Sequence, residues 1–338
     1  METRALGPFQ VGAIGLGCMN LCHAYGEPLS APDAERLLLA ALDMGVTHFD
    51  TAALYGFGVS ETLVGRALAP HRSRFTLASK CGMDGVTGED GVKRRVIDGR
   101  PEAIRKTCEE ALRRLRTDVI DLYYLHRWDR NVPIEDSVGA LAELVREGKI
   151  RAIGLSEVSA DTLRRAHAMH PVAAVQSEYS LWTRNPEIAV LEACRELGAA
   201  LVAFSPLGRG FLAGAVPDVA TAEAFVAKDL RRAMPRFQGA HLASNLRWLA
   251  DYTALAREAE CTPAQLALAW LLHKAPHILP IPGTRTVGHL QENMAAASLR
   301  LSEDIVARLE ALVNPGTVAG ARYNAATQTE IDTEEFSA

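Results

Sequence analysis

Short apolar runs and amphipathic segments alternate along most of the chain, and this alternation predicts strands and helices in turn. The apolar runs show little period-two alternation, which is typical of parallel strands buried on both faces. We expect strands at 14–17, 46–50, 75–80, 119–125, 150–155, 172–176, 199–204 and 277–281. Apolar residues at helical spacing, with start and stop signals, predict helices at 31–44, 60–68, 101–116, 133–147, 159–169, 186–197, 263–273, 286–297 and 302–312.

Eight strands with helices between them favour a closed (β/α)8 TIM barrel in the α/β class. A doubly wound sheet would place a glycine-rich phosphate turn directly after its first strand. Here the run Gly15-Leu16-Gly17-Cys18-Met19-Asn20 lacks the third glycine and does not lead directly into a helix. Polar residues at nearly every strand end also favour the barrel, because that rim is where barrels bind ligands.

Segments outside the alternation complete the predicted domain. Residues 4–11 predict an N-terminal β-hairpin that turns at Gly7-Pro8, and the last two helices are extra to the barrel. We therefore expect one barrel domain over residues 1–315. Two segments lack periodicity: 81–99, a long loop expected to cover the site, and 207–245, an irregular region with a short helix. The polar tail 316–338 is expected to be mobile.

Composition narrows the classes of partner. The 338-residue chain carries a net charge of −5 and no basic stripe, which argues against a nucleic-acid partner. No apolar run reaches the roughly 18 residues of a membrane span. The six scattered cysteines form no Cys-x-x-Cys pair, which indicates reduced thiols of a cytoplasmic protein and no metal site. The pattern favours a small-molecule ligand and indicates no particular oligomeric state.

Four polar residues follow or end three successive predicted strands. Asp50 ends one strand and Tyr55 lies in the loop after it, Lys80 ends the next strand, and His126 follows the third. Taken singly, such a tyrosine is typical of loop packing and such a lysine of a solvated strand end. Because neighbouring strand ends of a barrel meet at one rim, we expect the four side chains to converge there.

This group fits the reduction of a carbonyl compound. Hydride addition to a carbonyl carbon leaves charge on its oxygen, which needs a proton donor. A phenol with its ordinary pKa of about 10 is a weak donor near neutrality, so a neighbouring ammonium is expected to lower the pKa of Tyr55. Asp50 would hold Lys80 and balance its charge, and His126 would hydrogen-bond the substrate oxygen.

The motif Phe49-Asp50-Thr51-Ala52-x-x-Tyr55-Gly56, with Lys80 and Leu125-His126, resembles the catalytic tetrad of the aldo-keto reductase superfamily. Further runs, such as 153–159 and 176–182, are most similar to its pyridoxal reductase-like and perakine reductase-like branch. The resemblance covers residues 4 to about 315 and implies the (β/α)8 barrel, NADP(H) as cofactor, no metal, and a small carbonyl substrate such as an aromatic aldehyde. It implies the following cofactor contacts: Ser156 and Gln176 at the nicotinamide; Ser205, Leu207, Gly208 and Arg209 at the pyrophosphate; Gly283, Thr284, Arg285, His289, Glu292 and Asn293 at the adenosine phosphate.

Two residues differ from the pattern of the family that the chain resembles. Glu157 stands where many relatives have Asn beside the carboxamide-binding serine, and His289 stands where many have Arg. Arg285 is therefore expected to carry more of the contact with a 2′-phosphate and to select NADP over NAD. From spacing alone, an ordinary helix N-cap followed by a surface arginine is an equal alternative.

The substrate pocket is expected to include Tyr25, Trp128 and Trp182, although ordinary loop packing would explain the same aromatics equally well. Two other functions remain open. One is an alcohol or sugar dehydrogenase of the same fold, and the other is a slow-turnover, cofactor-binding regulatory subunit.

Overall fold

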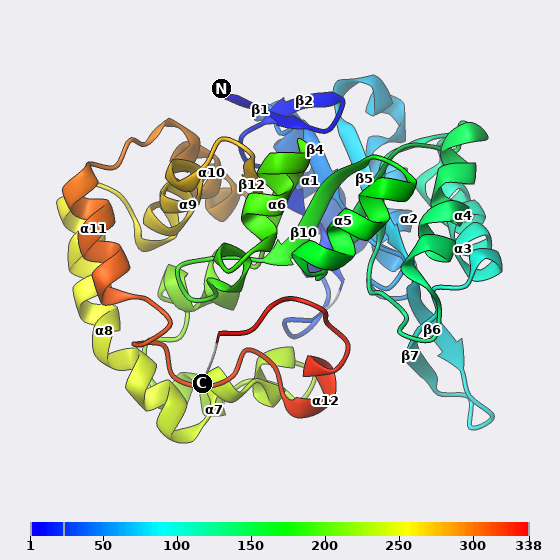
Figure 1. The fold of residues 1–338 in the computed structure, drawn as a ribbon. Coiled ribbons are helices and arrows are strands. Elements are labelled where there is room, and N and C mark those ends of the chain that lie inside the picture. The colour runs from blue at the N-terminus through cyan, green and yellow to red at the C-terminus, as the bar shows by residue number, and fades with distance from the viewer. Residues whose placement is uncertain (1, 23, 337–338) are drawn as a thin grey trace.

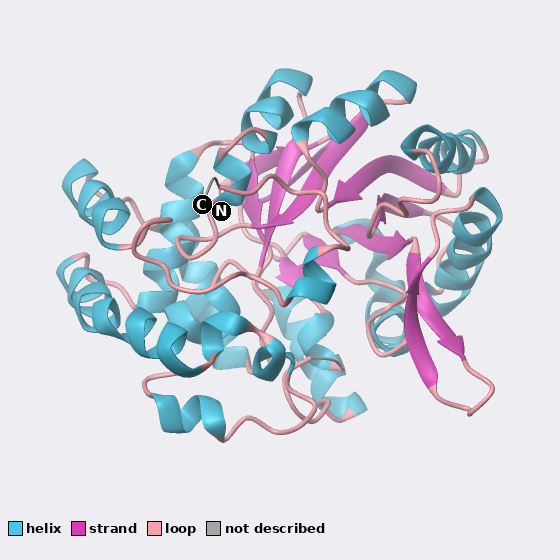
Figure 2. Cartoon of the chain, turned by 60° about the horizontal axis from the view of Figure 1, so that its bottom comes forward, coloured by secondary structure: helices cyan, strands magenta, loops and turns pink. Residues whose placement is uncertain are grey.

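Eight parallel strands form the central sheet of the protein, whose computed structural model describes residues 2–22 and 24–336. The strands are β3 (Leu16–Gly17), β4 (His48–Asp50), β5 (Thr76–Cys81), β8 (Ile120–Leu125), β9 (Ile150–Ser156), β10 (Val172–Glu178), β11 (Ala200–Phe204) and β12 (Ile278–Pro280). Each strand pairs with the next of these along the chain. This arrangement confirms the predicted (β/α)8 fold class (Figure 2).

Two backbone hydrogen bonds join the ends of this sheet. Gly15 donates to the carbonyl of Pro280 at 3.0 Å, and Gly17 donates to that of Pro282 at 3.2 Å. A Cβ atom on Gly17 would lie 2.8 Å from the Ile281 carbonyl oxygen, closer than side chains approach. Glycine is therefore required at position 17 for the first and last strands to meet.

Helices cover the outside of the sheet (Figure 1). Those between or after the strands are α1 (Ala31–Asp43), α2 (Val59–Leu68), α3 (Pro101–Leu115), α4 (Ile134–Arg146), α5 (Ala160–Met169), α6 (Val190–Leu197), α9 (Pro263–Lys274), α10 (Val287–Ala295) and α11 (Glu303–Leu312). Several begin at side-chain caps: the Ser30 hydroxyl accepts a hydrogen bond from the Asp33 amide, and Thr262 forms a capping box with Gln265.

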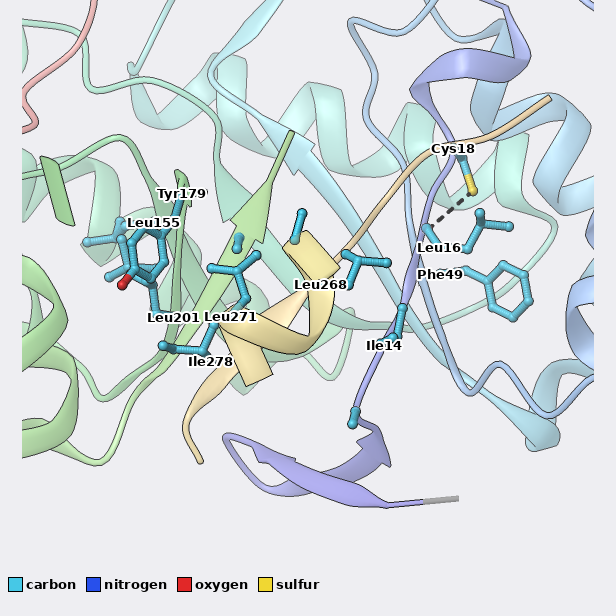
Figure 3. Close-up of a cluster of buried hydrophobic side chains, with 14 of the residues drawn as sticks. Ile14, Leu16, Cys18, Phe49, Leu155, Tyr179, Leu201, Leu268, Leu271 and Ile278 are labelled. Atoms are coloured by element: carbon cyan, nitrogen blue, oxygen red, sulfur yellow. Dashed lines mark hydrogen bonds between the residues drawn. The ribbon is translucent and has the colours of Figure 1, made fainter. Parts of the chain in front are cut away.

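Two apolar cores hold these layers together. The larger lies between strands and helices, where residues such as Leu201, Ile278 and Leu271 are fully buried (Figure 3). The smaller fills the inside of the sheet with side chains such as Leu122 and Val202. The predicted N-terminal hairpin, β1 (Thr3–Leu6) with β2 (Phe9–Gly12), adds its own apolar residues to that inner core. It covers the end where the strands begin, which leaves the opposite end for ligands (Figure 1).

Two segments differ from the sequence-based expectation. The predicted loop 81–99 contains an antiparallel hairpin, β6 (Met83–Thr87) with β7 (Lys93–Ile97). The irregular region contains a short helix as expected, α7 (Val219–Glu223). A twenty-residue helix that was not expected, α8 (Gly239–Glu258), begins near the end of this region and extends beyond it. Apolar side chains at positions 242, 249, 252 and 255 have helical spacing and were the available signal.

The C-terminal tail packs across the strand-end side of the barrel (Figure 1). It contains the short helix α12 (Ala325–Gln328), and its side chains Arg322 and Thr333 are buried. The sequence predicted a mobile tail and none of these contacts, because the burial of its side chains depends on partners far away in the chain.

The described residues contain no helix that is long and apolar enough to cross a lipid bilayer. They also contain no group of three His, Cys, Asp or Glu side chains that could hold a metal ion. All six cysteines are free thiols. The cytoplasmic location expected from the cysteine pattern stays a prediction.

Candidate active site

The four strand-end residues converge at one end of the barrel. The parallel register aligns Asp50 with Ala78 and Lys80 with Tyr124, which sets successive strand ends side by side. The Lys80 ammonium is fully buried and donates to an Asp50 carboxylate oxygen, to the Thr51 carbonyl at 2.8 Å and to the Tyr55 hydroxyl at 3.3 Å.

Asp50 is held from two sides. One carboxylate oxygen accepts from Lys80, and the other accepts from the Gln176 amide at 2.7 Å. The Gln176 side chain, which is expected to contact the cofactor, thus already donates its amide N–H to Asp50. The ion pair with Asp50 balances the charge of the buried Lys80 ammonium and holds it pointing toward Tyr55.

The pKa of Tyr55 differs from the sequence-based expectation. Burial raises the pKa of the phenol above its ordinary value, and the Lys80 ammonium acts in the opposite direction without cancelling this effect. The expectation of a lowered pKa for Tyr55 was therefore wrong. Tyr55 holds its proton at neutral pH, as a proton donor must, and Lys80 lies where it would stabilise the phenolate left after transfer.

His126 lies beside Tyr55, with ring centroids 6.0 Å apart and planes at 85°. Burial lowers the pKa of His126 well below its ordinary value, and the nearby charges of Arg127, Lys80 and Arg95 lower it further. The imidazole is therefore neutral at pH 7. A neutral ring donates from one nitrogen and accepts at the other, so it suits hydrogen bonding to a carbonyl oxygen.

A cavity of about 870 Å³ opens beside these residues and extends along the strand ends. Asp50, Tyr55 and His126 line it, whereas Lys80 lies behind them. Most residues expected to contact the cofactor also line it: Ser156, Gln176, Ser205, Leu207, Arg209, Gly283, Thr284, Arg285, His289, Glu292 and Asn293. Gly208 does not line it and packs on Trp182 instead, since a Cβ atom there would lie 2.9 Å from the indole ring.

Two of the three predicted substrate-pocket aromatics lie outside this cavity. Tyr25 lines it. Trp182 is buried and stacks on Phe211 with centroids 4.3 Å apart, and Trp128 donates its indole N–H to the Val132 carbonyl at 2.9 Å. For both tryptophans these contacts favour loop packing, the alternative that the sequence left open, and a role of either in substrate binding stays a prediction.

The far end of the cavity is built from two polar turns. Ser205, Gly208, Arg209 and Gly210 have positive φ angles of 47°, 55°, 58° and 92°, which bends the loop after β11 tightly. Helix α10 begins after Thr286, whose hydroxyl accepts a hydrogen bond from the His289 amide, so the N-cap lies two residues after Thr284. Arg285 is exposed and donates to the Tyr25 carbonyl at 3.3 Å.

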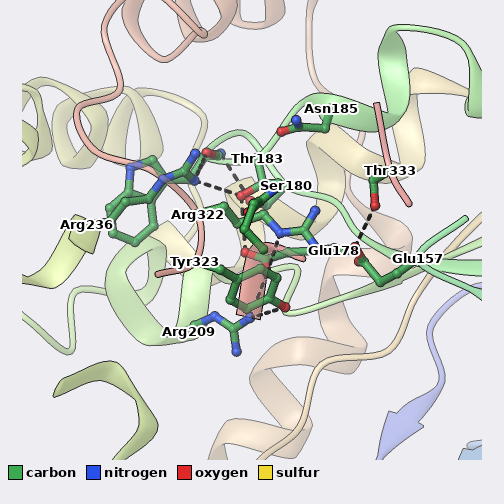
Figure 4. A network of polar contacts seen from close by, with 12 residues as sticks. Glu157, Glu178, Ser180, Thr183, Asn185, Arg209, Arg236, Arg322, Tyr323 and Thr333 are labelled. Atoms are coloured by element: carbon green, nitrogen blue, oxygen red, sulfur yellow. Dashed lines mark hydrogen bonds and ion pairs between the residues drawn. The ribbon is translucent and has the colours of Figure 1, made fainter. Parts of the chain in front are cut away.

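A buried network that the sequence did not predict joins this site to the C-terminal tail (Figure 4). Glu157 follows Ser156, has a φ of 56° and is buried. Its carboxylate accepts from the Arg322 guanidinium, from the Thr333 hydroxyl at 2.7 Å and from the Glu178 amide at 2.8 Å. Glu157, which stands where many relatives have Asn, was the one sign of this network in the sequence. The tail explains the carboxylate, because Arg322 and Thr333 both donate to it.

Arg209 belongs to the same network. Its guanidinium donates to Glu178 at 2.7 Å and to the Tyr323 hydroxyl at 3.2 Å (Figure 4). Arg209, which is expected to contact the cofactor pyrophosphate, is thus hydrogen-bonded to β10 and to the tail. The tail also meets the β6–β7 hairpin, where Glu330 pairs with Arg95. It therefore borders the cavity on two sides.

Comparison with known proteins gives consistent matches. Residues 13–314 match the model of the aldo/keto reductase family. A curated relative from Glycine max, "Probable aldo-keto reductase 1", is 44% identical over 318 residues, which cover 93% of this chain and 89% of the relative.

Solved structures of two bacterial enzymes are also similar. A glycerol dehydrogenase from Gluconobacter oxydans superposes with a TM-score of 0.83 at 30% identity over 92% of this chain and 94% of that one. An aldo/keto reductase from Klebsiella pneumoniae, in complex with NADP and acetate, gives 0.69 at 27% identity over 99% and 100%.

Proposed function

The chain belongs to the aldo/keto reductase family and is an NADP(H)-dependent oxidoreductase, and we propose that it reduces an aldehyde or ketone to an alcohol with Tyr55 as proton donor. One observation carries the assignment of roles. The Tyr55 hydroxyl lies 3.3 Å from the buried Lys80 ammonium, beside a neutral His126, at the wall of the cavity. A small-molecule carbonyl compound fits a cavity of about 870 Å³.

Each residue of this group would have a separate task. The His126 imidazole hydrogen-bonds the carbonyl oxygen and directs it toward the Tyr55 hydroxyl. As the carbonyl carbon is reduced, its oxygen takes the Tyr55 proton and becomes the alcohol. The phenolate that remains is stabilised by the Lys80 ammonium, which Asp50 holds in place. General acid catalysis of this kind contributes typically about 10²–10⁴-fold in rate.

The residues present fit NADP(H), which supplies the hydride when it is bound. Ser156 and Gln176 line the cavity next to Tyr55 and would hold the nicotinamide amide. The tight turn 205–210 and the amides at the start of α10 would hold the phosphates, since free amides at a helix N-terminus suit anions. Arg285, His289 and Asn293 would contact the adenosine end.

Tyr55→Phe tests the proposed proton donor. It should abolish turnover of an aldehyde panel followed by NADPH absorbance, while NADPH binding measured by fluorescence stays nearly normal. Tyr123→Phe is the matched control, because it removes a buried phenol hydroxyl outside the cavity. Retention of most activity in Tyr55→Phe would mean that another group supplies the proton.

The reverse reaction, oxidation of an alcohol, is the second candidate function. It is favoured by the similarity to an enzyme named as a glycerol dehydrogenase. Tyr55 would then act as the base, and its raised pKa would demand alkaline conditions for fast oxidation. Rates measured in both directions at equal pH and at cellular cofactor ratios separate the two directions.

A further inference from the structure

We propose that Arg127 forms an anion-binding subsite that selects carbonyl substrates carrying a carboxylate group. This inference rests on the proposed function, since the subsite would lie next to the reacting carbonyl. It concerns a residue to which neither the sequence motifs nor the tetrad assign a task.

Arg127 is a buried arginine whose side chain faces the cavity. The residue is 9% exposed, and it lines the cavity together with His126. One terminal nitrogen, Nη1, donates to the His126 carbonyl at 2.7 Å and to the Ser156 hydroxyl at 3.2 Å. The Nε nitrogen is buried and has no hydrogen-bond partner among the described residues. The guanidinium thus keeps a donor that no group of the described residues uses.

The other buried arginines show what is missing at Arg127. Within residues 2–22 and 24–336, Arg4, Arg127 and Arg322 are the arginines in the buried class. Arg4 pairs with Glu2 at 3.2 Å, and Arg322 pairs with Glu157. No described carboxylate lies within 4.0 Å of the Arg127 nitrogens. Because a buried charge without a counter-ion is costly, an anion that enters the cavity gains by pairing with it.

The surrounding charges do not supply this counter-ion. Arg95 on β7 also lines the cavity, and it is held by Glu330 of the tail. Asp50 is the nearby acid of the catalytic group, but both of its carboxylate oxygens are taken, by Lys80 and Gln176. This part of the cavity therefore carries an excess of positive charge.

The position of Arg127 restricts the class of substrate. It directly follows His126 in the chain, and its charge acts on the pKa values of both His126 and Tyr55. An anionic group bound there would be close to the carbonyl that these two residues address. Planar carboxylates match the guanidinium fork with two parallel hydrogen bonds. Aldehyde acids and keto acids of small size are the compounds that combine both groups.

A pair of matched substrates tests the subsite. 4-Carboxybenzaldehyde carries a carboxylate, whereas its methyl ester has the same ring and aldehyde without the charge. We expect wild-type kcat/KM with NADPH to favour the carboxylate by about 10-fold or more, mainly through KM, as a charge-assisted hydrogen bond predicts. This first comparison needs no variant and so does not depend on whether a variant folds.

Variants then assign the preference to Arg127. Arg127→Gln should bring the carboxylate-to-ester ratio of kcat/KM close to one, and Arg127→Lys should restore part of it. Arg231→Gln is the matched control and should keep the wild-type ratio, because this cavity-lining arginine already pairs with Asp229 at 2.6 Å.

Two results would overturn the subsite. One is a wild-type enzyme that reduces the ester at least as well as the carboxylate. The other is an Arg127→Gln variant that loses both substrates by the same factor, since that pattern would belong to a group acting on the reaction itself. Failure of the wild-type enzyme to reduce either compound, or any other aldehyde, would instead overturn the proposed function and this subsite with it.

Discussion

Replacing Arg322 by methionine should destabilise the protein strongly, although this residue lies in a tail that carries no recognised motif. Its side chain is 3% exposed, and it pairs with the Glu157 carboxylate, which is fully buried. Methionine keeps most of the aliphatic stem and removes the charge. Glu157 would keep its hydrogen bonds from Thr333 and the Glu178 amide but lose its counter-ion.

The size of the effect follows from the burial of the pair. Removing one partner of a buried ion pair costs about 3–5 kcal/mol, because the other charge stays buried and uncompensated. Unfolding entropy of about 2.1 cal/mol/K per residue gives about 0.7 kcal/mol/K for 338 residues. The melting temperature of Arg322→Met should therefore fall by about 4–7 °C.

The assay is a double-mutant cycle read by calorimetry. Glu157→Gln combined with Arg322→Met removes both charges, and it should be more stable than the sum of the single changes predicts. Arg164→Met is the surface control: Arg164 pairs with Glu196 at 2.7 Å with about half of each side chain exposed, so its loss should cost about 1 kcal/mol or less. If Arg322→Met costs no more stability than Arg164→Met, or if the cycle is additive, the buried pair does not hold the tail in place.

Three further outcomes are expected. Arg285→Ala should weaken NADPH binding by about 1–3 kcal/mol and leave NADH binding nearly unchanged, and equal losses for both would contradict a contact with the 2′-phosphate. Lys80→Met should move the apparent pKa of alcohol oxidation upward, because it removes the charge that opposes the effect of burial on Tyr55; an unmoved pH profile would exclude this role. His48 is fully buried, and burial lowers its pKa. Below about pH 6.5 the unfolded chain therefore binds more protons than the folded protein, and the stability of the fold decreases as the pH is lowered. His48→Leu should flatten that loss between pH 7.5 and 5.5 in urea unfolding, and an unchanged slope would assign it to other groups.

The barrel and the catalytic group could be predicted because both depend on local signals. Short apolar runs and helical spacing fix the order of strands and helices, and the parallel register then brings strand ends together. Asp50, Lys80 and His126 could be placed at one rim for this reason before any contact was known. The hairpin β6–β7 was missed because its exposed residues show no apolar period.

Other features of the site depend on contacts across the chain, which no local pattern contains. Glu157 and Arg322 are separated by 165 residues, and only the folded barrel makes them partners. Burial, which a sequence does not show, reverses the expected pKa shift of Tyr55.

The sequence by itself determined the order of elements, the barrel and the residues that meet at its rim, because period and strand ends are properties of neighbouring residues. The tertiary structure alone decided how deeply each charge is buried and which partner it finds. It pairs Arg322 with Glu157 and leaves Arg127 facing the cavity with no carboxylate partner in the described part of the chain. Electrostatic energies depend on distance and desolvation in three dimensions, so these two arginines could be told apart only in the folded protein.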